Sequence, residues 1–179
     1  EKGVVKTKMV DIAAEAGIGK GTIYEYYRSK EEIFGDTFRM IFDHMEIQIA
    51  NAIGHTQDPI IKLKTLIQVS YKEFLEHSGD LAGIMMGFWA EGVRSKSSDV
   101  LEIINLELVY TEYKMLIADI LHDGMKKGSF RKVDANSLAA IIVGAMDGVM
   151  LQWIMNKDMV DLEKVSEVMV DTLLSGIMK

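Results

Sequence analysis

The sequence predicts an all-α protein, and three observations carry that prediction. The chain has a single proline, Pro59, in 179 residues, and proline breaks helix interiors, so long uninterrupted helices are expected. Apolar residues recur at helical spacing along most of the chain. Alternation of apolar and polar residues, which would indicate a strand, never extends beyond four residues. Roughly eight helices are therefore expected.

Two short helices separated by a glycine are predicted near the start of the chain. Thr7 is a good N-cap for a helix over residues 8–16, and Gly17 ends it. Residues 19–27 read as the second short helix. The first helix has one apolar face, made by Met9, Ile12, Ala13 and Ala16.

Two longer helices are predicted to follow. Ser29 and Glu32 have the spacing of a capping box, in which each side chain satisfies an amide near the other residue. The helix that they begin is expected to end at Gly54. Asp58-Pro59 begins the next helix, because aspartate caps helices and proline is favoured at the first helical position. That helix is expected to end at about His77.

Four further helices are predicted in the second half of the chain. A short one around residues 81–91 precedes a polar loop at residues 95–98. A long helix opened by Asp99 reaches about Lys127, where Gly128 and Ser129 end it. The last two are capped by aspartates, Asp134 for residues 135–155 and Asp161 for residues 162–178.

Charge is distributed unevenly along the chain. Its net charge is −7, which taken alone opposes binding to nucleic acid. Residues 1–30 hold six basic and four acidic side chains, so this end carries +2 and the remainder carries −9. A basic end on an acidic body favours one DNA-facing tip on a body that phosphates repel.

Several classes of protein and site are not expected. Without cysteine there is no disulfide framework, thiolate nucleophile or cysteine-based zinc site. The four histidines lack metal-ligand spacing, and no catalytic triad, phosphate loop or paired catalytic carboxylates stand out, so neither an enzyme nor a cofactor is predicted. The longest apolar run, Leu138 to Met146, is too short to span a bilayer, and residues 1–8 lack the apolar part of a signal peptide. A cytoplasmic location is expected.

Residues Asp11 to Lys30 have the layout of a helix-turn-helix, in which one helix enters the major groove and the other crosses the backbone. Ala13 is small where the two helices must approach each other, and Ile18 and Ile23 can fill the angle between them. An ordinary helical hairpin is the competing interpretation, and Tyr26 could be half-buried. The groups suited to phosphates or base edges are Lys20, Gly21, Thr22, Tyr24, Tyr26 and Lys30.

The run GIGKGTIYEYYRSKEEIF, with DIAAEAG before it, resembles the DNA-binding segment of the tetracycline-repressor (TetR) family of bacterial regulators. The resemblance covers about residues 7–34 and rests on several spacings that agree together. It implies a DNA-binding head over residues 1–34 and a ligand-binding, dimerising body over residues 35–179. It also implies that Tyr27 is a buried aromatic and that the DNA contacts include Thr7, Lys20, Gly21, Thr22, Tyr24, Tyr26 and Lys30; Lys8, next to Thr7, is predicted as a further contact.

This chain departs from the family pattern at two places. The family has a further helix before Thr7, and Glu1-Lys2-Gly3 resembles only the tail of that helix. We therefore expect the head of this chain to lack its first helix, which puts DNA binding by this fragment in question. Gly19 stands where the family more often has Ser or Thr, so the second helix of the motif is expected to lack its usual cap.

The resemblance implies a homodimer through the last two helices and a small-molecule site in the body. Gly144 and Gly148 would let another helix approach closely, on a face that also holds Ile141, Ala145, Val149 and Gln152. The last helix carries a stripe of Val165, Val168, Met169, Thr172, Leu173 and Ile177, and packing within one chain is the alternative use of both faces. Aromatic and Met side chains with a few polar groups suit an apolar ligand. The predicted ligand-binding residues are Met85, Phe88, Trp89, Tyr110, Tyr113, Met146, Asp147, Met150 and Trp153.

The function predicted on these grounds is a ligand-responsive DNA-binding transcription regulator. It would be a repressor that a small apolar effector releases from a palindromic operator, with double-stranded DNA, a second copy and an unknown effector as partners. The acidic Glu91 and Asp147 among apolar neighbours are possible partners for a cationic group. A helical small-molecule-binding or protein-interaction module without sequence-specific DNA binding is the alternative. The sequence does not separate a repressor from an activator.

Overall fold

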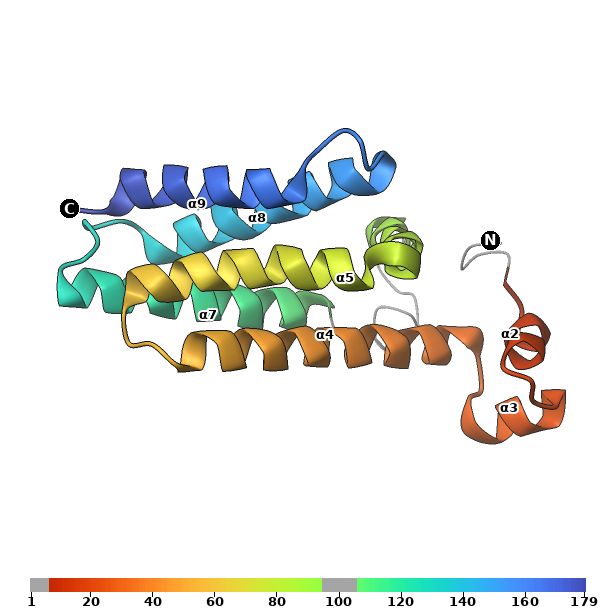
Figure 1. The fold of residues 1–179 in the computed structure, drawn as a ribbon. Coiled ribbons are helices and arrows are strands. Elements are labelled where there is room, and N and C mark those ends of the chain that lie inside the picture. Colours follow the sequence, from red (N-terminus) through yellow and green to blue (C-terminus); the bar gives the residue numbers. More distant parts are fainter. Residues whose placement is uncertain (1–6, 95–105) are drawn as a thin grey trace. The chain divides into compact units, whose positions relative to one another are not determined.

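The structure, a computed structural model, describes residues 7–94 and 106–179; among the side chains of residues 77–94 it describes only that of Met86, and it does not describe that of Leu106. The fold is all-α, as predicted (Figure 1). Within the described residues the sole β-type pairing is an isolated bridge between Phe130 and Met178. The predicted loop at residues 95–98 and the cap at Asp99 lie outside the described residues. The helices are α2 (Met9–Glu15), α3 (Lys20–Tyr26), α4 (Lys30–Gly54), α5 (Pro59–Arg94), α7 (Leu106–Lys127), α8 (Ala135–Met155) and α9 (Leu162–Ile177).

The chain divides into two compact units. Unit 1 consists of residues 1–44 and 78–106, and unit 2 of residues 45–77 and 107–179. The prediction that one helix ends at about His77 and another begins near residue 81 is wrong, because α5 continues through this point. A single glycine such as Gly79 costs a helix only about 1 kcal/mol and does not break it. One boundary between the two units nevertheless falls inside α5, between His77 and Ser78.

Three aspartate caps are confirmed in their predicted places. The carboxylate of Asp58 accepts a hydrogen bond from the amide of Ile60 (2.8 Å), with Pro59 at the first position of α5. The carboxylate of Asp134 accepts from the amide of Ser137 (2.7 Å) at the start of α8. Asp161 accepts from Lys164 (3.1 Å) at the start of α9 in the same way. Each contact satisfies an amide that the helix itself leaves without a partner.

Two other predicted helix starts need correction. The N-cap of α2 is Lys8 rather than Thr7, and the carboxylate of Asp11 accepts a hydrogen bond from the Lys8 amide (3.0 Å). The capping box before α4 is half formed. The Ser29 hydroxyl accepts from the Glu32 amide (3.3 Å), but the Glu32 carboxylate accepts from the amide of Arg28 (2.7 Å), one residue earlier than expected. A long glutamate side chain can reach either amide.

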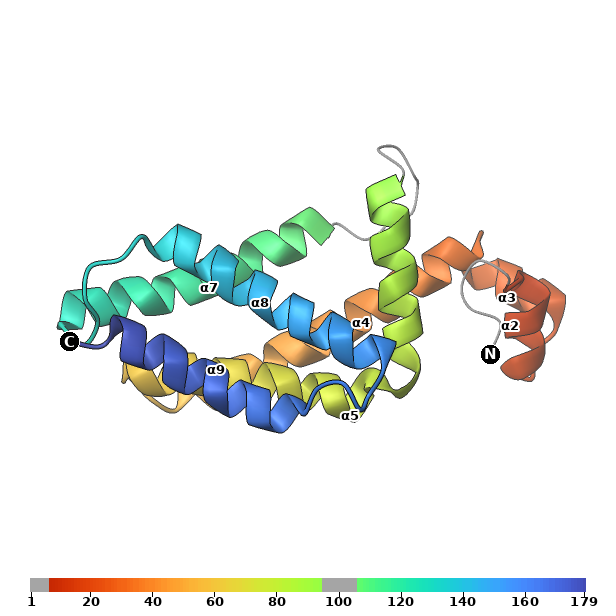
Figure 2. The ribbon, with the colours of Figure 1, turned by 90° about the horizontal axis from the view of Figure 1, so that it is seen from above.

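Unit 2 is a helical bundle built from α7, α8, α9, the last part of α4 and the first part of α5. Figures 1 and 2 show α8 and α9 adjacent, on one side of the layer that holds α7 and this part of α5. Phe74 of α5 meets Trp153 of α8 edge to face, with ring centroids 5.7 Å apart. Tyr71 of α5 donates a hydrogen bond to the Met169 sulfur of α9 (3.7 Å). The most deeply buried apolar side chains of unit 2 include Leu66, Ile67, Ile117, Leu121 and Ile142.

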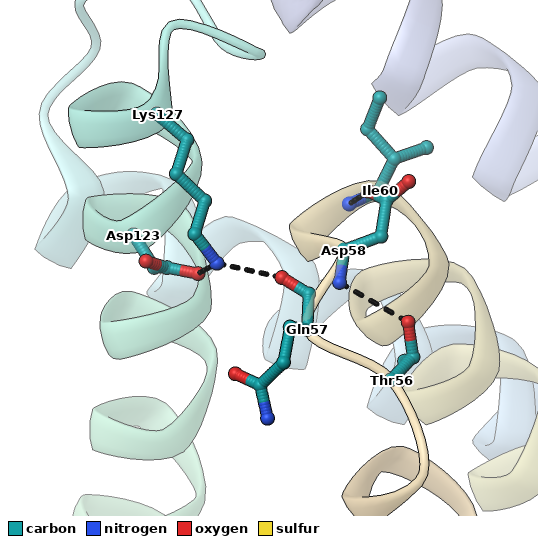
Figure 3. Close-up of polar contacts among 6 residues, drawn as sticks. All are labelled: Thr56, Gln57, Asp58, Ile60, Asp123 and Lys127. Atoms are coloured by element: carbon teal, nitrogen blue, oxygen red, sulfur yellow. Dashed lines mark hydrogen bonds and ion pairs between the residues drawn. The ribbon is translucent and has the colours of Figure 1, made fainter.

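Lys127, at the end of α7, ties the connection between α4 and α5 to the bundle (Figure 3). Its ammonium group donates to the backbone carbonyl of Gln57 (2.6 Å) and to the carboxylate of Asp123 (2.7 Å). Next to this contact the hydroxyl of Thr56 accepts from the amide of Asp58 (3.1 Å), the residue that caps α5. The last turn of α4 is thus connected to α7 through a short, hydrogen-bonded loop segment.

Candidate DNA-binding head and ligand-binding core

The two short helices of unit 1 rest on a small core of their own. Met9 and Ala13 of α2 and Ile23 of α3 are buried against each other. Ile12, Ile33 and Tyr27 pack against this cluster; Tyr27, which the resemblance implies is a buried aromatic, is half-buried here. Ala13 is 2% exposed, which fits its predicted place at the close approach of the two helices. The side of α3 that carries Ile23 packs on this core, and the opposite side of α3 is exposed to solvent.

The turn between α2 and α3 has the geometry that its sequence predicts. Gly17 has a φ of 66°, a left-handed conformation that residues with a Cβ rarely adopt. The amide of Gly17 donates to the carbonyl of Ala14 (3.2 Å), and the amide of Ile18 donates to the carbonyl of Ala13 (3.0 Å). This pair of bonds is a Schellman motif. Ile18 is 41% exposed, so its predicted role between the helices is wrong; Ile23 fills the angle, as predicted.

The predicted DNA-contact residues of α3 lie on its solvent-exposed surface. Lys20, Gly21 and Thr22 are exposed in the first turn, which Gly19 caps without a side-chain hydrogen bond, as expected. Tyr24 is 47% exposed and Tyr26 is 76% exposed, so Tyr26 is not half-buried. Together with the acidic Glu25, which is also exposed, these five residues form the exposed surface of α3. The other three contact candidates lie outside α3. Thr7, which is half-buried, and Lys8, which is exposed, precede α2, and Lys30 is half-buried at the first residue of α4.

In unit 2, Asp147 forms a hydrogen bond across two helices. It is the only ionisable residue of α8, and its carboxylate accepts a hydrogen bond from the hydroxyl of Tyr110 of α7 (2.9 Å). Burial raises the pKa of Asp147 above its usual value, and the hydrogen bond from Tyr110 partly opposes that rise. The cost of desolvation therefore exceeds what this one hydrogen bond returns.

A second polar contact joins α5 to α7 nearby. The hydroxyls of Ser70 and Tyr113 lie 2.7 Å apart, and Ser70 also donates to the carbonyl of Leu66 (2.8 Å). Because a serine has one hydroxyl proton, Tyr113 is the donor to Ser70. Burial and the negative charge of Asp147 raise the pKa of Tyr71 to about 12; burial first, and Asp147 less strongly, also raise that of Tyr113. Both phenols therefore remain protonated hydrogen-bond donors at neutral pH.

Six of the nine predicted ligand-binding residues have described side chains, and all six lie on α7 and α8 of unit 2. Met146, Met150 and Trp153 are buried, and Tyr110, Tyr113 and Asp147 make the polar contacts above. The side chains of the other three, Met85, Phe88 and Trp89, lie outside the described residues.

Sequence reasoning missed the contribution of α5 to this part of the core. Ser70, Tyr71, Glu73 and Phe74 are all buried there, and each is at most 7% exposed. The available signal was a helical stripe from Ile67 through Tyr71 and Phe74 that is interrupted by polar residues. Polar groups inside an apolar stripe indicate a buried polar cluster rather than plain packing. The polar core of unit 2 is hereafter the group of its buried polar residues Ser70, Tyr71 and Glu73 and the half-buried Tyr110, Tyr113 and Asp147.

The raised pKa of Asp147 predicts that Asp147→Asn stabilises the protein at neutral pH. A carboxyl whose pKa is higher in the folded state contributes stability below its unfolded value of 3.8, and this contribution is lost as the pH rises through the folded value. Asparagine keeps an acceptor for Tyr110 and carries no charge. Thermal unfolding at pH 7 should show a higher Tm for Asp147→Asn, with the difference shrinking below about pH 4. Asp119→Asn, on an exposed part of α7, is the matched control; a lower Tm for Asp147→Asn at pH 7 would contradict this account.

Two protein-family models match this chain. The family model described as bacterial regulatory proteins, tetR family, matches residues 1–37. The model described as YsiA-like protein, C-terminal region, matches residues 38–176. The chain belongs to the TetR family. TetR-family regulators are DNA-binding transcription regulators and not enzymes, which confirms the predicted class.

The chain is similar over nearly its whole length to characterised TetR-family regulators. It is 26% identical over 178 residues to the fatty acid metabolism regulator protein of Bacillus subtilis, covering 99% of this chain and 88% of the relative. It is 25% identical over 177 residues to the transcriptional repressor KstR2 of Mycolicibacterium smegmatis, covering 99% and 83%. The crystal structure of FadR from Bacillus subtilis in complex with stearoyl-CoA superposes with a TM-score of 0.81 at 24% identity, covering 98% of this chain and 91% of FadR. The fold is thus that of TetR-family regulators, and the family membership makes this chain a DNA-binding transcription regulator.

Proposed function

We propose that this TetR-family regulator is a homodimeric repressor that binds a palindromic operator and leaves it when a small effector with an apolar body enters the bundle. Residues 1–34 would form the DNA-binding head and residues 35–179 the effector-binding and dimerising body. The observation that carries the proposal is the exposed surface of α3, held on the buried core of Met9, Ala13 and Ile23. The protein would act in the cytoplasm, where its operator is.

On the DNA, each group of the head has a distinct proposed role. Lys20 and Thr22 would contact base edges or phosphates at the start of α3, where Gly21 leaves room for close approach. The hydroxyls of Tyr24 and Tyr26 would donate to phosphate oxygens. The remaining contacts would come from Thr7 and Lys8 before α2 and from Lys30 at the start of α4. These contacts would fix the register of α3 on the duplex.

The surface of α8 supports the homodimer. Ile141 is 63% exposed, and Gly144 and Ala145 on the same face are also exposed. A Cβ added at Gly144 or Gly148 would meet nothing within 4 Å, so no helix of the described part of this chain occupies the space above them. By length and composition α8 is apolar enough to cross a bilayer, yet only 33% of its apolar stretch is buried. A second copy would cover this face as a protein–protein interface does.

The last helix contributes less to this face than its sequence stripe suggests. Ile177 is buried at 3% exposure, and Met169 accepts the hydrogen bond from Tyr71 inside the unit. Val168, at 56% exposure, and the exposed Thr172 remain available on α9. The proposed interface therefore consists mainly of α8, with the Val168 side of α9 added to it.

Ile141→Asp should convert the dimer to monomer. A charge placed on a face that pairs with itself would sit opposite its own copy, and desolvating it opposes association. Sedimentation velocity at micromolar concentration should show the change, and operator affinity should fall because two linked heads bind far better than one. Ile61→Asp is the matched control, since Ile61 is 49% exposed and lies on a different helix, α5. A dimer that survives Ile141→Asp unchanged would place the interface elsewhere.

The proposed effector site lies in unit 2 and is lined by Tyr110, Tyr113, Met146, Asp147, Met150 and Trp153. These residues combine buried apolar side chains with a few polar groups, which is the usual make-up of a small-molecule site. The stearoyl-CoA in the Bacillus subtilis relative supports an effector with an extended apolar part. Met85, Phe88 and Trp89 of α5 belong to unit 1, and their role in ligand binding remains a sequence-based prediction.

Selection of bound duplexes from a random DNA pool tests the proposal. The dimer should enrich a palindrome whose half-sites are about one helical turn apart, because two symmetry-related heads must each reach a major groove. A pool that emerges without any sequence preference would remove the repressor assignment and leave a helical binding module.

A further inference from the structure

Asp147 occupies an unusual position for an ionisable residue. α8 is otherwise without charge from Ala135 to Met155. Asp147 is half-buried, and of its neighbours one turn away Val143 and Met150 are buried, Leu151 is half-buried and Gly144 is exposed. Placing a carboxylate there costs free energy unless charges or hydrogen bonds compensate for the lost water. A residue that costs stability and still forms a defined contact is a candidate for function rather than packing.

The chain itself compensates Asp147 only in part. Within the described residues its carboxylate accepts one hydrogen bond, from Tyr110, and forms no ion pair. An ionised carboxylate has room for about four hydrogen bonds on its two oxygens. No Lys, Arg or His side chain described in unit 2 is buried: Lys62 and Lys114 are half-buried, and the others are exposed. No basic side chain of this described region therefore neutralises Asp147 from within the core.

The other members of the polar core add to the same electrostatic character. Glu73 is a second carboxyl residue, 7% exposed, on the face of α5 that also carries Ser70 and Phe74. Tyr71 and Tyr113 lie close enough to Asp147 for its charge to raise the pKa of both phenols. Carboxylates beside aromatic rings attract cations through charge and through the negative faces of the rings. The interior of unit 2 is thus suited to a positive group and opposes a negative one.

We propose that the effector carries a positively charged, amine-type group at one end of an apolar body, and that Asp147 binds this group in the polar core of unit 2. The inference rests on the proposed function and specifies the chemistry of its effector site. The cation would take the carboxylate positions that Tyr110 leaves open, while Met146, Met150 and Trp153 contact the apolar body. A carboxylate or phosphate placed at the same point would meet Asp147 as a like charge.

Three probes with ten-carbon chains test the proposal: decylammonium, decanol and decanoate. Their apolar parts differ by at most one methylene, which is worth about 0.8 kcal/mol, so a larger difference in binding reports the head group. Isothermal titration to the full chain should give at least about tenfold tighter binding for the ammonium probe than for decanol, and the weakest binding for decanoate. Asp147→Asn should reduce the affinity of the ammonium probe to within about twofold of decanol and leave decanol unchanged. Asp119→Asn, at an exposed position on α7, should behave like the parent.

Three outcomes would overturn the inference. They are decanoate binding as tightly as the ammonium probe, no measurable binding of the ammonium probe, and a cation preference that survives Asp147→Asn in a protein shown by its melting curve to be folded. Operator binding is measured separately on the same samples. Loss of operator binding with the cation preference intact would remove the proposed repressor function and leave the ligand assignment standing.

Discussion

Replacing Lys20 with alanine and Tyr24 and Tyr26 with phenylalanine should weaken operator binding by on the order of 100-fold or more, while the protein stays folded and dimeric. Hydrogen bonds to charged groups contribute about 1.5–3 kcal/mol each, and the triple variant would lack three such bonds in each head of the dimer. All three side chains are exposed on α3 and none belongs to the buried core of the head, so folding should be unaffected. Fluorescence anisotropy with the selected operator and circular dichroism on the same samples measure the two properties.

The single Lys20→Ala variant adds a sharper readout. If Lys20 binds a phosphate, the slope of log affinity against log salt concentration should become shallower by about 1 for each lysine–phosphate pair that the substitution removes. Lys64→Ala removes the same charge from an exposed position on α5 and should leave that slope unchanged. Equal effects of the two variants would mean that net charge, rather than a contact made by α3, governs the binding. An unchanged affinity in the triple variant would contradict the assignment of α3 as the DNA-reading helix.

Gly124→Ala should destabilise the protein by about 3 kcal/mol, lowering Tm by about 6–12 °C. A Cβ at Gly124 would overlap ring carbons Cδ2 and Cε2 of Phe130, which is 1% exposed. The ring has little freedom to move, because the amide of Phe130 also donates to the carbonyl of Gly124 (3.1 Å). The backbone of Arg131 is held as well, since its amide donates to the carbonyl of Ile177 (2.7 Å).

The control is Gly176→Ala on α9, where a Cβ would meet nothing within 4 Å. Alanine is favoured over glycine in a helix by about 1 kcal/mol, so this variant should melt at the same temperature as the parent or higher. Combining Gly124→Ala with Phe130→Leu should cost less than the sum of the two single changes, because the smaller side chain relieves the overlap. A Gly124→Ala protein that melts like Gly176→Ala would show that the ring moves aside freely.

Features of this fold that depend on neighbours in sequence were predictable. Asp58, Asp134 and Asp161 cap their helices through amides two or three residues away, and Gly17 ends α2 through its own left-handed backbone. The helix-turn-helix could be recognised for the same reason. Its turn, its small core and the exposed tyrosines are contained in about twenty consecutive residues.

Features that depend on distant packing were not predictable to the same degree. Ile18 and Ile23 look alike in sequence, but only Ile23 faces the core of the head. The contact of Lys127 with the carbonyl of Gln57 spans 70 positions of sequence. The polar core of unit 2 depends on which face of α5 meets α7 and α8, so the interrupted stripe from Ile67 through Phe74 did not show what Ser70 and Glu73 would meet. Helical periodicity shows that a helix has a face, and tertiary packing decides what that face meets.

The measurement that tests the central claim most directly is fluorescence-anisotropy binding of the full-length protein to its own upstream intergenic DNA across a salt series. A dimeric TetR-family repressor should bind tightly, resist excess competitor DNA and show a steep decline of affinity with salt. Binding no stronger than that to random DNA of the same length, with the same salt slope, would contradict sequence-specific recognition of that region by the exposed surface of α3.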